Sequence, residues 1–185
     1  TFKMLTKKTI GFIGGGNLAE ALIKGLLSSK AVRAGQILVS DRLSDRLIHI
    51  AEVYEVKVLN KNYETALTSD IIFITVKPKD VGPALKEIAP ELTREKLLIS
   101  VAAGITTDFI QAVLRGSGAK GFVPVIRAMP NTPATVQEGV TALFAGEGVE
   151  DKDMRLAEAV FKSVGKVVVL DDEALMDVVT GLSGS

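Results

Sequence analysis

The chain has 185 residues, 47% of them hydrophobic, so it can bury one full core and its length predicts one domain, or one domain and part of another. Because 22 basic side chains balance 22 acidic ones, no long-range field attracts a polyanion, and we expect no nucleic-acid partner. The chain has no cysteine, a single histidine (His49) and no apolar run of roughly 18 residues, which argues against disulfides, a thiolate or histidine metal centre and a membrane span, and we expect a cytoplasmic protein.

Short continuous apolar runs alternate along the chain with segments of helical period. Such runs are typical of strands that helices cover on both faces, so we expect an α/β fold with a mostly parallel sheet. The runs predict about eight strands, at Ile10–Ile13, Ile37–Ser40, Val56–Leu59, Ile71–Val76, Leu97–Ala102, Val125–Met129, Val140–Ala145 and Val167–Leu170.

Five segments between these runs have the apolar spacing of helices that pack one face on a sheet. They lie at about 18–26, 47–54, 80–89, 107–114 and 151–164. Gly25 in the first segment allows a close approach, and His49 in the second lies opposite the apolar face, where we expect it to be exposed. Thr106 or Thr107 is suited to cap the fourth helix.

The helix at 151–164 has well-marked ends, because Asp151 is suited to cap its start and Gly165 to end it in a left-handed conformation. After the last strand, the acidic segment Asp171–Glu173 begins a further helix at about 174–182. We expect residues 1–170 to form one domain and residues 171–185 to begin a second, helical one. Since the chain starts without methionine and stops in a Gly-Ser-rich stretch, we expect it to be a fragment.

A glycine-rich turn follows the first predicted strand. Residues 9–19 read TIGFIGGGNLA, a strand that runs into G-x-G-x-x-A and then into an amphipathic helix. In this context Gly14 permits the tight turn, Gly16 lets the backbone approach a pyrophosphate, and Ala19 keeps helix and strand close. The free N–H groups of the helix start then hold the phosphates. The sequence thus predicts a Rossmann-type domain that binds a nicotinamide dinucleotide, the alternative being a glycine turn that only packs.

The end of the second predicted strand bears on the choice of coenzyme. Asp41 lies where an acid accepts hydrogen bonds from the adenosine ribose, which favours NAD. Arg42 follows at once, and its guanidinium can hold a 2′-phosphate, which favours NADP. A solvated turn pair is the alternative for both residues. We expect NADP, with NAD tolerated.

Three further loops are candidates, since ligands of open α/β sheets bind outside the carboxyl ends of the strands. They are Thr75–Pro78, where proline fixes the strand exit; Ala102–Gly104, small enough for a flat ring to approach; and Met129–Pro133, a rigid loop with an amide and a hydroxyl. Each alone is equally consistent with a simple strand-exit turn. Together on one sheet edge they outline a nicotinamide pocket.

Five stretches of the chain occur together, in this order, in one family. They are GFIGGGNLAEALIKG, SDIIFITVKP, ISVAAGIT, IRAMPNTPATVQEGVT and DVVTGLSGS. Through them the chain resembles the pyrroline-5-carboxylate reductases, the last enzymes of proline synthesis. The combination of VKP, AAG, PNTP and TGLSGS is far more specific than the glycine turn.

The resemblance implies a set of coenzyme contacts and no catalytic side chain. Asp41 falls where the family contacts the ribose or its phosphate, and departs from the small hydroxyl residue of some members; Asn62 matches an amide on the adenosine side. The pyrophosphate contacts are Ile13, Gly14, Gly15, Gly16, Asn17 and Leu18. Those of the nicotinamide half are Thr75, Val76, Lys77, Pro78, Val101, Ala102 and Ala103, with Asn131 and Thr132 beside the ring.

The implied reaction is hydride transfer to the C=N carbon of 1-pyrroline-5-carboxylate, a small-molecule substrate. A protonated imine is already a good electrophile, so the protein mainly orients two rings and excludes water. Lys77 acts electrostatically there or is a solvated turn lysine. In the family, TGLSGS continues into a helical domain with the substrate contacts and the dimer interface. We therefore expect an active homo-oligomer at full length, and a chain of 185 residues that binds dinucleotide but reduces the imine poorly or not at all.

Two other functions stay open. One is another reductase of the 6-phosphogluconate dehydrogenase-like group, acting on a hydroxy acid or a deazaflavin, although PNTP and TGLSGS argue against it. The other is a dinucleotide-binding module without catalysis, which would bind coenzyme tightly at full length and show no reductase activity.

Overall fold

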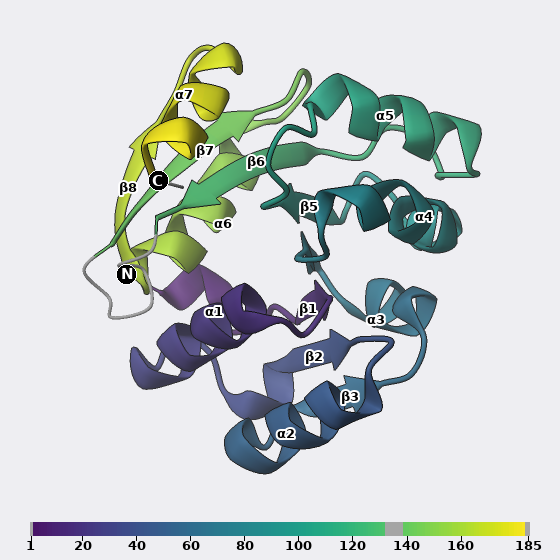
Figure 1. Cartoon of the computed structure of the whole chain (residues 1–185), viewed down its shortest axis with the longest axis vertical. Helices are drawn as coiled ribbons and strands as arrows, with labels where there is room; N and C mark the ends of the chain where they lie inside the picture. The colour runs from purple at the N-terminus through teal and green to yellow at the C-terminus, as the bar shows by residue number, and fades with distance from the viewer. Residues whose placement is uncertain (1, 132–138, 184–185) are drawn as a thin grey trace.

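The chain folds around one eight-stranded sheet, seen in a computed structural model that describes residues 2–131 and 139–183. The strand order is β3-β2-β1-β4-β5-β6-β7-β8, and all neighbours are parallel except β6 and β7 (Figure 1). The strands are β1 Ile10–Ile13, β2 Ile37–Ser40, β3 Lys57–Leu59, β4 Ile71–Ile74, β5 Leu97–Ser100, β6 Val125–Pro130, β7 Gly139–Ala145 and β8 Gly165–Val169. The order of the first six strands is that of a doubly wound dinucleotide-binding fold, which confirms the predicted fold class.

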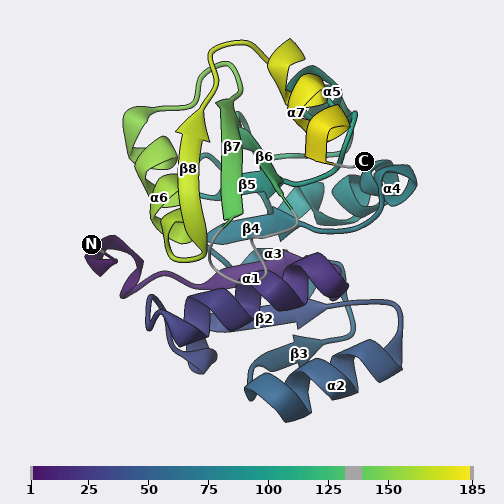
Figure 2. The same cartoon turned by 60° about the vertical axis from the view of Figure 1, so that its left-hand side comes forward.

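Helices cover both faces of the sheet. In the described residues they are α1 Asn17–Ser28, α2 Ser44–Tyr54, α3 Asn62–Thr68, α4 Pro78–Ile88, α5 Thr107–Gly116, α6 Asp151–Lys162 and α7 Ala174–Ser183, with short 3-10 turns at Lys3–Leu5, Ala34–Gln36 and Ala89–Glu91. One core cluster joins α1, α2 and α6 to one face, and a second joins α3, α4 and α5 to the other. The α7 helix packs on β6 and β7, at the opposite end of the molecule from β3 and α2 (Figure 2). Within the described part, no helix is both long and apolar enough to cross a bilayer.

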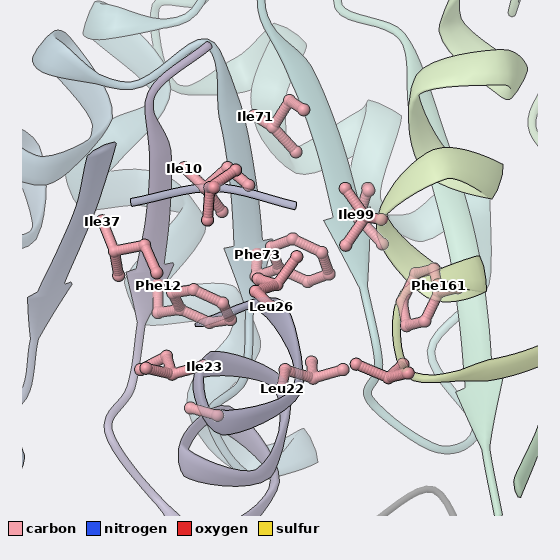
Figure 3. Close-up of a cluster of buried hydrophobic side chains, with 14 of the residues drawn as sticks. Ile10, Phe12, Leu22, Ile23, Leu26, Ile37, Ile71, Phe73, Ile99 and Phe161 are labelled. Atoms are coloured by element: carbon pink, nitrogen blue, oxygen red, sulfur yellow. The ribbon is translucent and has the colours of Figure 1, made fainter. Parts of the chain in front are cut away.

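The first core cluster holds α1 against the end of β1. Phe12 of β1 stacks on Phe73 of β4 with ring centroids 4.9 Å apart, and Phe161 of α6 meets Phe73 edge-on at 5.7 Å (Figure 3). Leu22 and Leu26 of α1 are buried in the same cluster. This packing fixes the direction in which α1 leaves the glycine turn, and therefore where its N–H groups point.

Some expected elements begin or end elsewhere. The sequence did not predict α3, since a helix of seven residues that buries only Thr65 and Ala66 has too short an apolar stripe to be recognised. The strands β4 and β5 each end two residues before their predicted ends. Pro78 does more than end a strand, because it occupies the first turn of α4, where its lack of an N–H costs nothing.

The helix α6 begins at Asp151 as expected, but its predicted cap and its predicted C-terminal end are wrong. Glu150, not Asp151, is the N-cap: the Asp153 N–H donates to the Glu150 backbone carbonyl at 3.0 Å, and the Asp153 carboxylate accepts the Glu150 N–H at 3.0 Å. The helix ends at Lys162, and Gly165 belongs to β8. There the backbone of Gly139 on β7 comes so close that any Cβ at Gly165 would overlap its carbonyl oxygen. The glycine thus serves strand pairing and not helix termination.

Candidate functional site

The candidate site lies at the carboxyl ends of the central strands, where the chain turns from β1 into α1. Gly14 has φ +109°, and a Cβ there would lie 2.9 Å from the backbone carbonyl of Thr75. Its N–H donates to the Ser40 carbonyl at 2.8 Å, and its carbonyl accepts the Thr75 hydroxyl at 2.7 Å. The ends of β1, β2 and β4 are therefore locked together, and only glycine fits at this position.

The start of α1 faces open space. Gly16 is the N-cap and has no side chain to cap the helix, and none of the described side chains accepts the first N–H groups of α1. A Cβ built on Gly16 would meet none of the described residues within 4 Å, and the φ of Gly16, −76°, suits any residue. Asn17 is exposed, Leu18 is half-buried, and Ala19 is fully buried against the sheet. A helix start with room in front of its N–H groups suits an anionic group such as a pyrophosphate.

Two charged side chains clamp the peptide groups of Gly15. Its N–H donates to Asp41 Oδ2 at 2.7 Å, and its carbonyl accepts the Arg46 Nε–H at 2.8 Å. The other Asp41 oxygen accepts the Leu43 N–H at 2.8 Å. Asp41 therefore uses both oxygens to fix the backbone around the turn, a role that the sequence did not reveal.

Glu20 of α1 links the turn to α2. Its carboxylate accepts hydrogen bonds from Arg46 Nη2 at 2.7 Å and from the Tyr54 hydroxyl at 2.9 Å, and lies 2.8 Å from His49 Nε2. Desolvation opposes ionisation, but these hydrogen bonds outweigh it and lower the pKa of Glu20 to about 2. Desolvation and the bond to Glu20 raise the pKa of Tyr54 to about 12. The exposure predicted for His49 is confirmed, with 47% of its side chain exposed.

Sequence reasoning missed Glu20 and Arg46. The one available signal was that Arg46 and His49 are three residues apart and so share a side of α2. The acid that they meet lies on another helix, and nothing in the spacing identifies it.

The adenosine side, as the sequence predicts it, is polar. Ser40 at the end of β2 donates its hydroxyl to Asn62 Oδ1 at 2.8 Å. The Asn62 amide in turn donates to Glu87 of α4 at 3.0 Å. Arg42 is 82% exposed and pairs with Asp80 of α4, Nη2 to Oδ2, at 3.4 Å. The structure thus places Asp41 and Arg42 on the loop that follows β2, and Asn62 at the start of α3, after β3.

The predicted nicotinamide side is formed by the loops after β4 and β5. The Thr75 hydroxyl faces the carbonyls of Ile13 and Gly14, whereas Lys77 is exposed as the N-cap of α4. Val76 and Val101 are half-buried, Ala102 is buried, and the Val101 N–H still donates to β4. Ala103 packs against a cluster that contains Met129 of β6 and Met176 of α7. These loops are small and apolar apart from Lys77, as contact with a flat ring requires.

Asn131 closes the connection between β6 and β7. Its N–H donates to the Val140 carbonyl at 3.2 Å, and its Oδ1 accepts the Val140 N–H at 2.9 Å. The amide oxygen is thus used within the protein. Thr132 and Pro133 of the predicted loop lie outside the described residues.

A buried charge on β6 was also missed. The side chain of Arg127 is 2% exposed and pairs with Glu173, before α7, at 3.2 Å. The Glu173 carboxylate also accepts the N–H of Thr107 at 2.7 Å and its hydroxyl at 3.0 Å. An arginine inside an apolar strand run was a signal, because a buried guanidinium needs an acidic partner.

Comparisons with known proteins agree with the fold. Residues 9–104 match the family described as NADP oxidoreductase coenzyme F420-dependent. A pyrroline-5-carboxylate reductase of Synechocystis is 39% identical over 178 residues, covering 95% of this chain and 63% of the relative. A solved pyrroline-5-carboxylate reductase of Coxiella burnetii has a TM-score of 0.86 at 33% identity, covering 95% of this chain and 63% of the other. A pyrroline carboxylate reductase of Plasmodium falciparum, solved with NADP bound, has a TM-score of 0.83 at 26% identity, covering 96% and 63%. The chain spans about 63% of the length of these relatives.

Proposed function

Since the chain belongs to the family described as NADP oxidoreductase coenzyme F420-dependent, and is similar to pyrroline-5-carboxylate reductases over 95% of its length, we propose that it is the coenzyme-binding part of such a reductase. The reaction is the reduction of 1-pyrroline-5-carboxylate to proline, in the cytoplasm, with NADPH as the preferred coenzyme and NADH tolerated. The relative solved with NADP supports the choice of coenzyme.

The observation that carries the proposal is the start of α1. Its first N–H groups are uncapped by a side chain, and the space beside Gly16 is open, so Ile13 to Leu18 fit a pyrophosphate. Asp41, Arg42 and Asn62 hold the adenosine ribose. The backbone of Val101 to Ala103 and the Thr75–Pro78 turn orient the ring and exclude water from one side of it. When bound, the reduced nicotinamide supplies the hydride.

Gly16→Val tests this site without disturbing the fold. The φ of Gly16 suits any residue and its Cβ direction is open, so the new side chain costs less than about 0.5 kcal/mol of stability. It fills the space in which the pyrophosphate would lie, and we expect the affinities for NADPH and NADH to fall at least about tenfold, measured by calorimetric titration.

Gly35→Val is the matched control, because a Cβ at Gly35 also meets nothing within 4 Å and Gly35 lies outside the site. It should leave both affinities unchanged. If Gly16→Val binds both coenzymes as the unmodified chain does, the pyrophosphate does not lie at the start of α1, and the assignment of the site is wrong.

We further propose that residues 1–170 form the coenzyme domain, and that residues 171–185 begin a helical domain with the substrate contacts and the subunit interface of a homo-oligomer. The chain of 185 residues should therefore bind coenzyme but show no steady turnover with 1-pyrroline-5-carboxylate. The assay follows NADPH absorbance at saturating substrate, with a full-length relative as the positive control. Steady turnover by the 185-residue chain would refute the assignment of the substrate site to the second domain.

A further inference from the structure

A single ion pair joins the loop after β2 to the helix after β4 in the described structure. Arg42 Nη2 lies 3.4 Å from Asp80 Oδ2. The two side chains differ in exposure: 82% of the Arg42 side chain is exposed, but only 26% of the Asp80 side chain. The glycine turn lies between the two strands concerned, since β1 separates β2 from β4.

Asp80 is the fixed partner of the pair. It lies in the first turn of α4, which Pro78 begins, and its N–H donates to the Lys77 carbonyl at 2.8 Å. A carboxylate is favoured at that end of a helix. Arg42, by contrast, has a long side chain in solvent, and the Asp80 carboxylate is its only acidic partner in the described residues.

The neighbouring carboxylate of Asp41 does not compete for Arg42. Both of its oxygens accept backbone N–H groups, from Gly15 at 2.7 Å and from Leu43 at 2.8 Å. Of the two side chains in this turn, Arg42 is therefore the one that can move toward a new anionic group. To do so, it must break its ion pair with Asp80.

We propose that Asp80 sets the coenzyme preference by competing with the 2′-phosphate of NADP for the guanidinium of Arg42. The inference rests on the proposed function, which places the adenosine ribose beside this turn. Without a 2′-phosphate, as in NAD, Arg42 keeps its pair with Asp80. With one, Arg42 must leave Asp80 to pair with the phosphate, and the loss of that ion pair weakens the binding of NADP.

Asp80→Asn tests the competition by calorimetric titration of the 185-residue chain with NADPH and with NADH. Since exposed ion pairs are weak, we expect NADPH to bind about two- to fivefold more tightly and NADH to be unaffected. The gain should shrink in about 1 M salt, where the Debye length is about 3 Å. In an Arg42→Ala background, Asp80→Asn should have no effect, because the guanidinium for which Asp80 and the phosphate compete is absent. Asp108→Asn, an exposed acid in the first turn of α5, is the matched control and should change neither affinity.

The titrations distinguish a failure of the Asp80 competition from a failure of the proposed function on which it rests. If the unmodified chain binds neither coenzyme, the proposed function and the inference both fail. If NADH and NADPH bind but Asp80→Asn changes neither affinity, or changes both equally, the inference alone is overturned. It is also overturned if the NADPH gain persists in the Arg42→Ala background, since Asp80 would then act on the phosphate directly.

Discussion

Glu20 organises the polar network behind the glycine turn. It accepts three side-chain hydrogen-bond partners from α2, and one of them, Arg46, also holds the carbonyl of Gly15. Because the network favours the ionised carboxylate, the pKa of Glu20 in the folded chain is about 2 instead of 4.5. An acid whose pKa is lowered by folding stabilises the folded state only while it is ionised.

The stability of the chain should therefore fall as the pH drops from about 4.5 through 2, the range between the unfolded and folded pKa values of Glu20. In Glu20→Gln this contribution is absent, so its free energy of unfolding should fall less steeply over the same range. Urea titrations at stepped pH, followed by circular dichroism, measure the slopes. Glu52→Gln, on the exposed side of α2, is the control and should keep the slope of the unmodified chain. Equal slopes for Glu20→Gln and the unmodified chain would contradict the assignment.

At the scale of elements, α1 can approach the segment that follows α6 because Gly25 has no side chain. Gly25 lies in the middle of α1, where glycine costs about 1 kcal/mol relative to alanine. Glycine is nevertheless required at this position, because a Cβ at Gly25 would overlap the side chain of Val164. The close approach that the sequence predicted at Gly25 is confirmed.

Gly25→Ala should thus destabilise the chain by about 1–3 kcal/mol, although alanine favours the helix. Adding Val164→Ala should restore part of the loss, since it removes the overlapping methyl groups. Gly82→Ala in α4 is the matched control, because its nearest neighbour would be Phe109 at 3.9 Å, and it should be neutral or slightly stabilising. Thermal unfolding of these three variants and of the unmodified chain measures the differences, and a stabilised Gly25→Ala would show that α1 can move away from Val164 freely.

At the scale of the whole molecule, α7 is fixed to the sheet by charge as well as by apolar contact. Met176 packs with Met129 and Ala142, and the buried Arg127 pairs with Glu173 at the start of the helix. Among the described residues Arg127 Nη2 has no hydrogen-bond partner, and it lies 3.8 Å from Asp177 Oδ1. Glu173 therefore supplies most of the interaction that offsets the burial of the Arg127 charge.

Glu173→Ala should lower the free energy of unfolding by about 3 kcal/mol, because it leaves a buried guanidinium without its main partner. It also removes the acceptor for the N–H and hydroxyl of Thr107. Asp171→Ala, two residues earlier and exposed, is the control. Urea unfolding compares them, and a loss no larger for Glu173→Ala than for the control would mean that the pair contributes nothing to the docking of α7.

Most of the fold was predictable because it depends on local apolar pattern. Each of the eight strands overlaps the apolar run that predicted it, and the central strands β1, β2, β4 and β5 are fully buried, as such runs indicate. The helix α3 escaped prediction because its seven residues bury too little surface to leave a periodic signal. The cap of α6 was misplaced by one residue, because acids occupy positions 150, 151 and 153 and the local sequence does not distinguish which of them is the cap.

By itself, the sequence determined the α/β class, the glycine turn and the likeness to the pyrroline-5-carboxylate reductases, all of which rest on residues close together in the chain. The tertiary structure alone decided which charges meet. Arg46 and Glu20 are 26 residues apart, and Arg127 and Glu173 are 46 apart. Arg42 follows β2 and Asp80 lies in the first turn of α4, after β4, on the two sides of β1. The order of the strands in the sheet brings these groups together, and that order cannot be predicted from the apolar periodicity of the sequence.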